Sequence, residues 1–319
     1  MKKIPSLIFL FFLVCGSGSA QFRMSARTGI LETEVNEILW DKQGDDAQII
    51  SQLDWNTYAA PVISLNAEYK LADTFIFGLN GFYTIPVSYG IIEDYDYMNI
   101  LSTGGTERTH YSKHDNELNN YWNAGIFLGA GGRFSENLKI YGLFSFSYSY
   151  YCFTAYNGFR QYGAKIGTQN SNDIYEAWNE DIPEKPMEGK IITFEAQKYF
   201  LGLGTRIEYN PFDFFSCILS INLLPGLKTE ALDTHHKRKP AYYYFDLPSE
   251  LAFNSSLLLE YKLSKHNALN ICFNFFASSV SDGKLSASWN KNNWTEYANQ
   301  CGIKETSWRL LLGYSFIYE

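Results

Sequence analysis

Two short acidic motifs in this sequence have residue types and spacings that suit hydrolytic chemistry. In the first, Asp94 and Asp96 are separated by one residue, so both carboxylates face the same side at the end of an extended strand. Two close carboxylates can share a proton or hold a water molecule between them. Taken alone the signal is weak, because an acidic pair in a polar loop is usually only solvated.

The second motif combines a carboxylate with an imidazole. Asp233 and His235 have the same spacing of two, which again places both side chains on one face. A carboxylate beside an imidazole fixes its tautomer and stabilises the protonated ring, so His235 has the attributes of a general base. The alternative to a catalytic role is a solvated pair of surface histidines, because His236 is followed by the basic run 237–239.

Metal chemistry is a competing interpretation of the second motif. His235 and His236 point to opposite faces of a strand, and no third histidine or cysteine lies nearby, which disfavours the usual zinc ligand sets. We therefore expect no metal and no cofactor. Four cysteines beyond the first twenty residues have no metal-ligand spacing, could pair in three ways, and are interpreted as structural: Cys152, Cys217, Cys272 and Cys301.

The elements around these motifs alternate with a period of two. Between Trp308 and Tyr318 the even-numbered residues are all apolar or aromatic, and segments 75–83, 215–223 and 269–277 alternate in the same way. An apolar face opposite a mixed, often polar face is typical of a membrane-spanning β-barrel strand. A soluble β-sandwich is the alternative, and the aromatic content of 17% argues against it because Tyr and Trp favour membrane interfaces.

The connections between strands are asymmetric. Short turns are expected at 71–73, 135–137, 210–212 and 264–266, and they alternate with long polar segments at 41–48, 91–117, 159–189, 230–247 and 287–303. Short turns on one side and long loops on the other imply an all-β, closed, ten-stranded antiparallel transmembrane barrel with long extracellular loops. Both acidic motifs fall in long loops, so the site is expected at the extracellular end.

The first twenty residues differ from the rest. A positive start, the apolar run Ile4–Val14 and small residues up to Ala20 indicate a cleaved secretory signal peptide, which leaves 21–319 as one outer-membrane barrel domain. No later stretch is long and apolar enough for a transmembrane helix. The net charge of −8 argues against nucleic acid as a partner.

Six segments occur in an order and spacing that is specific when they are taken together. They are Glu37–Trp40, Ser51–Trp55, Asp94–Met98, Ser112–His114, Phe153–Ala155 with Gly158 close behind, and Asp233–His235. In these segments the chain resembles the omptins, outer-membrane endopeptidases built as ten-stranded barrels. The last third of the chain is similar in architecture more than in residues.

The resemblance implies a mechanism with four catalytic residues. A water molecule would lie between the pair Asp94 and Asp96 and the pair Asp233 and His235. His235, oriented by Asp233, would take a proton from this water, which would attack the scissile carbonyl without a covalent acyl-enzyme.

The resemblance also implies substrate-binding positions, some of which depart from the family pattern. Glu37, Ser112 and His114 match the family, whereas His110 and Ala231 stand where family members have acids. The missing acid at position 231 predicts a weaker preference for a basic residue before the cleaved bond. Acidic residues in 159–189 still favour cationic polypeptides as substrates overall.

Two other functions are compatible with an outer-membrane barrel, and its expected surrounding is lipid. A catalytically inactive barrel could serve as an adhesin or receptor through its loops, although such a barrel has no reason to keep all four catalytic positions. A porin or transporter is disfavoured by the small strand number. Outer-membrane lipid, with lipopolysaccharide as a candidate, is the expected surrounding, but Tyr150 stands where the family has a lipopolysaccharide-binding Arg.

Overall fold

The structure of the chain is a computed structural model that describes residues 20–42, 47–100, 106–169, 172–248 and 251–318. The expected signal peptide therefore lies outside the described residues, except for Ala20. Within the described ranges the chain is strand almost throughout and contains no helix, so no helix there is long and apolar enough to cross a membrane.

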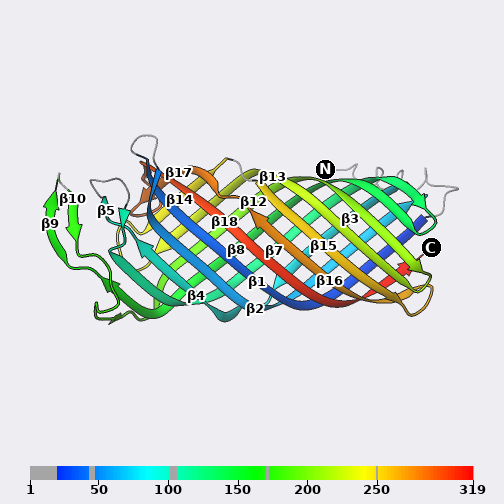
Figure 1. Ribbon diagram of the computed structural model, residues 1–319, viewed down its shortest axis with the longest axis horizontal. Helices are drawn as coiled ribbons and strands as arrows, with labels where there is room; N and C mark the ends of the chain where they lie inside the picture. Colours follow the sequence, from blue (N-terminus) through cyan, green and yellow to red (C-terminus); the bar gives the residue numbers. More distant parts are fainter. Residues whose placement is uncertain (1–19, 43–46, 101–105, 170–171, 249–250, 319) are drawn as a thin grey trace.

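Ten antiparallel strands form a ring, which confirms the predicted fold class (Figure 1). Hydrogen bonds between the first and last strands join its two ends, from Phe22 opposite Tyr318 to Trp40 opposite Gln300. In ring order the strands are β1 (Ala20–Lys42), β2 (Ala47–Leu71), β3 (Phe75–Thr84) continued by β4 (Val87–Asp96), β7 (His110–Ser135), β8 (Leu138–Tyr162), β12 (Lys190–Phe212), β13 (Phe215–His235), β15 (Leu251–Lys262) extended by β14 (Tyr242–Leu247), β16 (Asn267–Ser278) extended by β17 (Ser281–Ser288), and β18 (Trp294–Tyr318).

The short turns lie at one end of the ring and the longer connections at the other. Three short turns are where the alternation predicts them, whereas β12 continues through Phe212, so the expected turn at 210–212 comes later. At the other end the strands run on into the segments expected as loops: Asp96 ends β4 and His235 ends β13. Short strands also lie at this end: β5 (Asn99–Ile100), β6 (Thr106–Glu107), β9 (Lys165–Gln169), β10 (Asn172–Tyr175) and β11 (Lys185–Pro186).

Apolar side chains project outward around the half of the barrel near the short turns. We call this band the lipid belt; it includes Leu65, Phe77, Leu79, Leu128, Phe144, Leu203, Leu223, Ile271, Leu312 and Phe316. The expected outward faces of 75–83, 215–223, 269–277 and 308–318 all contribute exposed side chains to it. An apolar exterior over a polar interior is the arrangement that a bilayer requires of a barrel.

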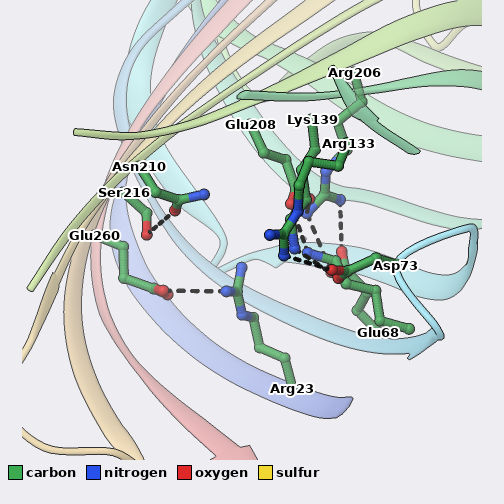
Figure 2. A network of polar contacts seen from close by, with 11 residues as sticks. Arg23, Glu68, Asp73, Arg133, Lys139, Arg206, Glu208, Asn210, Ser216 and Glu260 are labelled. Atoms are coloured by element: carbon green, nitrogen blue, oxygen red, sulfur yellow. Dashed lines mark hydrogen bonds and ion pairs between the residues drawn. The ribbon is translucent and has the colours of Figure 1, made fainter. Parts of the chain in front are cut away.

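Inside the lipid belt the barrel contains paired charges, beside a cavity of about 220 Å³. Arg206 lies 2.5 Å from Glu68 and Lys70 lies 2.6 Å from Glu208. Figure 2 shows Arg206 and Glu68 extending toward one another from different strands, with Arg23 reaching Glu260 nearby. Pairing is what makes buried charges tolerable, because an unpaired charge loses its hydration without compensation.

Above the charges an aromatic layer, formed by Trp55, Tyr151, Phe153, Phe194 and Phe245, crosses the barrel. All five side chains are fully buried. The Trp55 ring stacks on Phe153 and Phe194 at centroid distances of 5.7 and 5.9 Å. This layer separates the charged interior from the end of the ring where β4 and β13 terminate.

Candidate active site

Asp233 and His235 end strand β13 and point into the ring. Both are buried, with exposed fractions of 2% and 6%. The Oδ2 atom of Asp233 lies 2.6 Å from Nε2 of His235, which is a short, charge-assisted hydrogen-bond distance. His236 is exposed on the other face, and its Nε2 lies 3.0 Å from Oγ1 of Thr193. The predicted division of the two histidines between opposite faces is confirmed.

A bulge in β13 is what turns this pair inward. Between the Tyr199–Lys228 and Phe200–Gly226 pairs, β13 has one residue more than β12, which makes Leu227 the extra residue. A single extra residue exchanges the two faces of a strand. The inward side chains of β13 are accordingly even-numbered before the bulge and odd-numbered after it.

Asp94 and Asp96 lie at the end of β4, where β4 pairs with both β2 and β7. Asp94 is buried and accepts a hydrogen bond from the hydroxyl of Ser112 at 3.3 Å. Ser112 in turn lies 3.0 Å from Nε2 of His114, whose Nδ1 contacts the backbone oxygen of Asn157. Burial, followed by the charge of Asp96, raises the pKa of Asp94 well above its ordinary value, so Asp94 retains a proton to higher pH than a free carboxyl.

Glu37 connects the two pairs. It projects inward from β1, is 2% exposed, and accepts a hydrogen bond from the indole of Trp55 at 3.4 Å. Burial, and then the charge of Asp233, raises its pKa well above the ordinary value, and the charge of Asp233 also acts on Asp94. We call Glu37, Asp94, Asp96 and Asp233 the acid cluster. The structure thus gathers the four residues predicted to be catalytic, together with Glu37, at one end of the ring.

Two oxygens of the acid cluster have unused hydrogen-bonding capacity. Oδ1 of Asp94 and Oδ1 of Asp233 are buried and reach no hydrogen-bond donor among the described residues. Buried carboxylate oxygens are normally paired, so such atoms point to a role with a bound molecule. A water molecule or a substrate group between β4 and β13 could use both.

The remaining predicted substrate positions are split between two environments. The ring of His110 packs against Tyr162 and Tyr175 at centroid distances of 4.4 and 4.9 Å, and burial lowers its pKa. Ala231 is buried and belongs to the same core as Phe194 and Phe245. His110 therefore borders the rim of the site, whereas Ala231 lies at the aromatic layer beneath it.

Arg238 is a member of the site that the sequence did not reveal. The basic run 237–239 entered the sequence analysis only as a sign of a surface position; Arg238 is exposed, and its Nη2 atom also lies 3.0 Å from Nε2 of His235. Its guanidinium also lies 5.6 Å from the ring centroid of Tyr243. Burial lowers the pKa of Arg238, but Tyr243 and then Asp96 and Asp94 outweigh it and raise the pKa overall. The only signal in the sequence was that Arg238 follows the Asp-x-His motif by three residues.

The longer connections are fastened to one another beside the acid cluster. The guanidinium of Arg108 stacks on the indole of Trp178 at 3.6 Å, and the amide of Asn99 makes two hydrogen bonds to the backbone of Tyr175, at 2.7 and 2.9 Å. Residues 97–100 and 106–109 therefore form one rim with residues 163–169 and 172–189. Figure 1 shows β9 and β10 projecting beyond the barrel from this rim.

Neither metal ligation nor disulfide bonding is seen in the described part of the chain. No group of three His, Cys, Asp or Glu side chains there is placed to hold a metal ion. The four cysteines, Cys152, Cys217, Cys272 and Cys301, are free thiols.

One solved structure shares the fold of this chain. The outer membrane protease OmpT from Escherichia coli superposes with a TM-score of 0.82 at 17% identity, over 95% of this chain and 100% of that chain. The outer membrane protein OprG from Pseudomonas aeruginosa gives a TM-score of 0.41 at 11% identity, over 95% of this chain and 98% of that chain. No match was found among curated protein sequences.

The first likeness shows the fold, and a family model adds the relationship in sequence. The model of the omptin family matches residues 19–318. This match runs from the start of β1 to the last residue of β18. The chain therefore belongs to the omptin family.

Proposed function

We propose that this protein is an outer-membrane endopeptidase that cleaves polypeptides with a water molecule held in the acid cluster. The observation that carries the proposal is the meeting of Asp94 and Asp96, from β4, with the hydrogen-bonded pair Asp233 and His235, from β13. Two buried carboxylate oxygens without donors, Oδ1 of Asp94 and of Asp233, offer positions for the water. The site lies at the end of the barrel away from the short turns, which we assign to the extracellular side.

Each group in the mechanism has a role that follows from its environment. Asp233 holds the imidazole of His235 and stabilises its protonated form. His235 takes a proton from the water, the resulting hydroxide attacks the carbonyl carbon, and the same proton then passes to the leaving amine. Asp94, whose pKa burial raises, can keep a proton and donate a hydrogen bond while Asp96 accepts one from the water. No acyl-enzyme forms and no metal or cofactor takes part.

Cationic polypeptides are the proposed substrates. The rim segment 172–189 carries acidic residues at its exposed surface, among them Glu176, Glu180, Asp181, Glu184 and Glu188. An acidic rim raises the local concentration of cationic chains, and salt weakens this effect. Glu37, Ser112, His114 and His110 are proposed to contact the substrate beside the cleaved bond, and the alanine at position 231 to weaken selection for a basic side chain there.

Outer-membrane lipid is the proposed partner of the lipid belt. The expected difference at the lipopolysaccharide position concerns Tyr150, whose hydroxyl donates a hydrogen bond to Glu195 at 2.8 Å. We propose that lipopolysaccharide, where it binds, does so without a cation at this position.

The test is cleavage of a peptide library by refolded protein in detergent, with the cuts mapped by mass spectrometry. His235→Ala and Asp94→Ala should each lower the cleavage rate by roughly 10²–10⁴-fold, the usual cost of losing a positioned acid or base. His236→Ala is the matched control and should keep most activity, because its side chain faces away from the acid cluster. Folded protein that cuts no peptide would sink the proposal and leave a binding role for the rim.

A further inference from the structure

A cation supplied by the protein itself lies beside the acid cluster. Arg238 lies in the segment between β13 and β14, and its guanidinium reaches back to within 3.0 Å of Nε2 of His235. The charges of Asp94, Asp96 and Asp233 all act on it. It therefore lies beside the Asp233–His235 pair, and the charges of Asp94 and Asp96 reach it from the other pair.

The short segment that carries Arg238 is held at both ends. The backbone N–H of His235 donates to the oxygen of Ala241 at 2.7 Å, and that of His236 donates to Ile191 at 2.8 Å. The guanidinium faces Tyr243 on the next strand. Because the segment is anchored in this way, the fold itself brings Arg238 back over the site.

The contact of Arg238 with His235 competes with the contact that catalysis needs. Nε2 of His235 lies 2.6 Å from Asp233 and 3.0 Å from Arg238. To donate to the carboxylate of Asp233, Nε2 must carry a hydrogen; to accept from Arg238, it must not. The two hydrogen bonds exclude each other on one nitrogen, so Arg238 must withdraw from His235 when the Asp233–His235 pair works.

We propose that Arg238 is a specificity-determining residue: its guanidinium fills the place of a substrate's basic side chain beside the acid cluster, and so selects against a basic residue immediately before the cleaved bond. This inference rests on the proposed function and makes it more specific. An arginine or lysine of the substrate would have to share the site with a cation on which the charges of the same acids already act, whereas an uncharged side chain leaves Arg238 beside them. The acidic rim attracts cationic chains, and Arg238 determines which residue of such a chain is accepted immediately before the cleaved bond.

The experiment compares two peptides that differ only in the residue before the cut, arginine or norleucine. The ratio of kcat/KM for the two is measured for the unmodified protein and for Arg238→Gln, Arg238→Lys and Lys237→Gln. Arg238→Gln should raise the arginine-to-norleucine ratio by at least ~10-fold, because the acid cluster loses its internal cation. Arg238→Lys keeps a cation, and Lys237→Gln removes an exposed one from the same segment; both ratios should stay within about threefold of the unmodified protein.

Binding of arginine amide and norleucine amide, measured by calorimetry, provides a readout that does not need cleavage. Arg238→Gln should bind arginine amide at least ~10-fold more tightly than the unmodified protein does, with norleucine amide unchanged. An unchanged ratio and unchanged binding would overturn the inference. So would an equal loss of kcat on both peptides, which would make Arg238 a donor to the reacting carbonyl. Tighter binding of arginine amide in a protein that cuts nothing would support the cation site and overturn the proteolytic function.

Discussion

Among single residues, Glu37 makes the stability of the protein depend on pH. Its folded-state pKa is raised by burial and by Asp233, so the folded protein holds this proton more tightly than the unfolded chain does. The stability that comes from this proton is present at low pH and is lost as the pH rises through the raised pKa. The unfolding temperature of the unmodified protein should therefore fall as the pH is raised from about 5 to about 8.

Glu37→Gln should reduce that loss, because glutamine has no proton to release. The measurement is thermal unfolding in detergent, followed by circular dichroism at the two pH values. Glu296→Gln is the control, since Glu296 is an exposed carboxyl that pairs with Lys284 at the surface. Equal losses in the unmodified protein and in Glu37→Gln would mean that other groups carry the pH dependence.

The sequence identified the two acidic motifs at residue level but not the charge that lies beside them. Asp94, Asp96, Asp233 and His235 were recognisable because spacing of two on a strand puts each pair on one face, and the structure brings the pairs together. Arg238 was not, because an arginine in a basic run looks the same whether it extends into solvent or folds back. Only the anchored segment between β13 and β14 decides which of these it does.

Among the strands, β13 shows how far periodicity can be extended. From Phe215 to Leu223 its odd-numbered residues face the lipid, and simple continuation would send Asp233 outward too. The bulge at Leu227 reverses the faces, and nothing in the local pattern marks it strongly. Bulges shift register by one residue and leave composition unchanged, so a sequence reveals the strand and its length more readily than the side to which its end points.

The rim is expected to depend on a single stacking contact. Trp178→Ala removes the surface on which Arg108 lies at 3.6 Å, a contact worth about 1 kcal/mol at a partly exposed site. In an Asp94→Ala background, which prevents self-cleavage, added trypsin should cut segment 163–189 about fivefold faster in Trp178→Ala. Peptide mapping over time gives the rate.

The control for the rim is Trp289→Ala, which removes an exposed tryptophan from the connection between β17 and β18. Its cutting rate in segment 163–189 should equal that of the background protein. If Trp178→Ala also leaves the rate unchanged, the hydrogen bonds of Asn99 hold the rim without help from the stack.

For the whole molecule, the aromatic layer across the interior predicts that the barrel is closed to ions. The aromatic layer crosses the ring with no exposed side chain, and the charges beneath it are paired across the interior. Protein reconstituted into a planar bilayer should give no steady conductance above that of the bare bilayer. Altered migration of unboiled protein in SDS gels confirms that the sample is folded. Steady, single-size current steps would favour the pore function that the strand number disfavours.

The architecture as a whole was predictable because a bilayer leaves few choices. Alternating faces and a strict sequence of short and long connections imply an even, closed ring, and the structure has ten strands. The boundaries at the far end were wrong: the segments expected as loops continue as paired strands to Asp96 and His235. A polar segment is interpreted as a loop when the lipid-facing residues are the criterion for a strand. Backbone pairing between neighbouring strands, however, continues beyond the edge of the lipid.

This extension of β13 beyond the lipid belt determines how far the acid cluster stands above the membrane. Ten residues separate Leu223, in the belt, from Asp233, so the site stands ~33 Å further along the strand at ~3.3 Å per residue. With a strand tilt of about 40°, that is on the order of 25 Å above Leu223 and about 15 Å above Leu227, the last exposed apolar side chain of β13. For a protease this height selects targets by how far they stand above the membrane: chains that extend past it can be cut, and surface proteins that lie lower are out of reach.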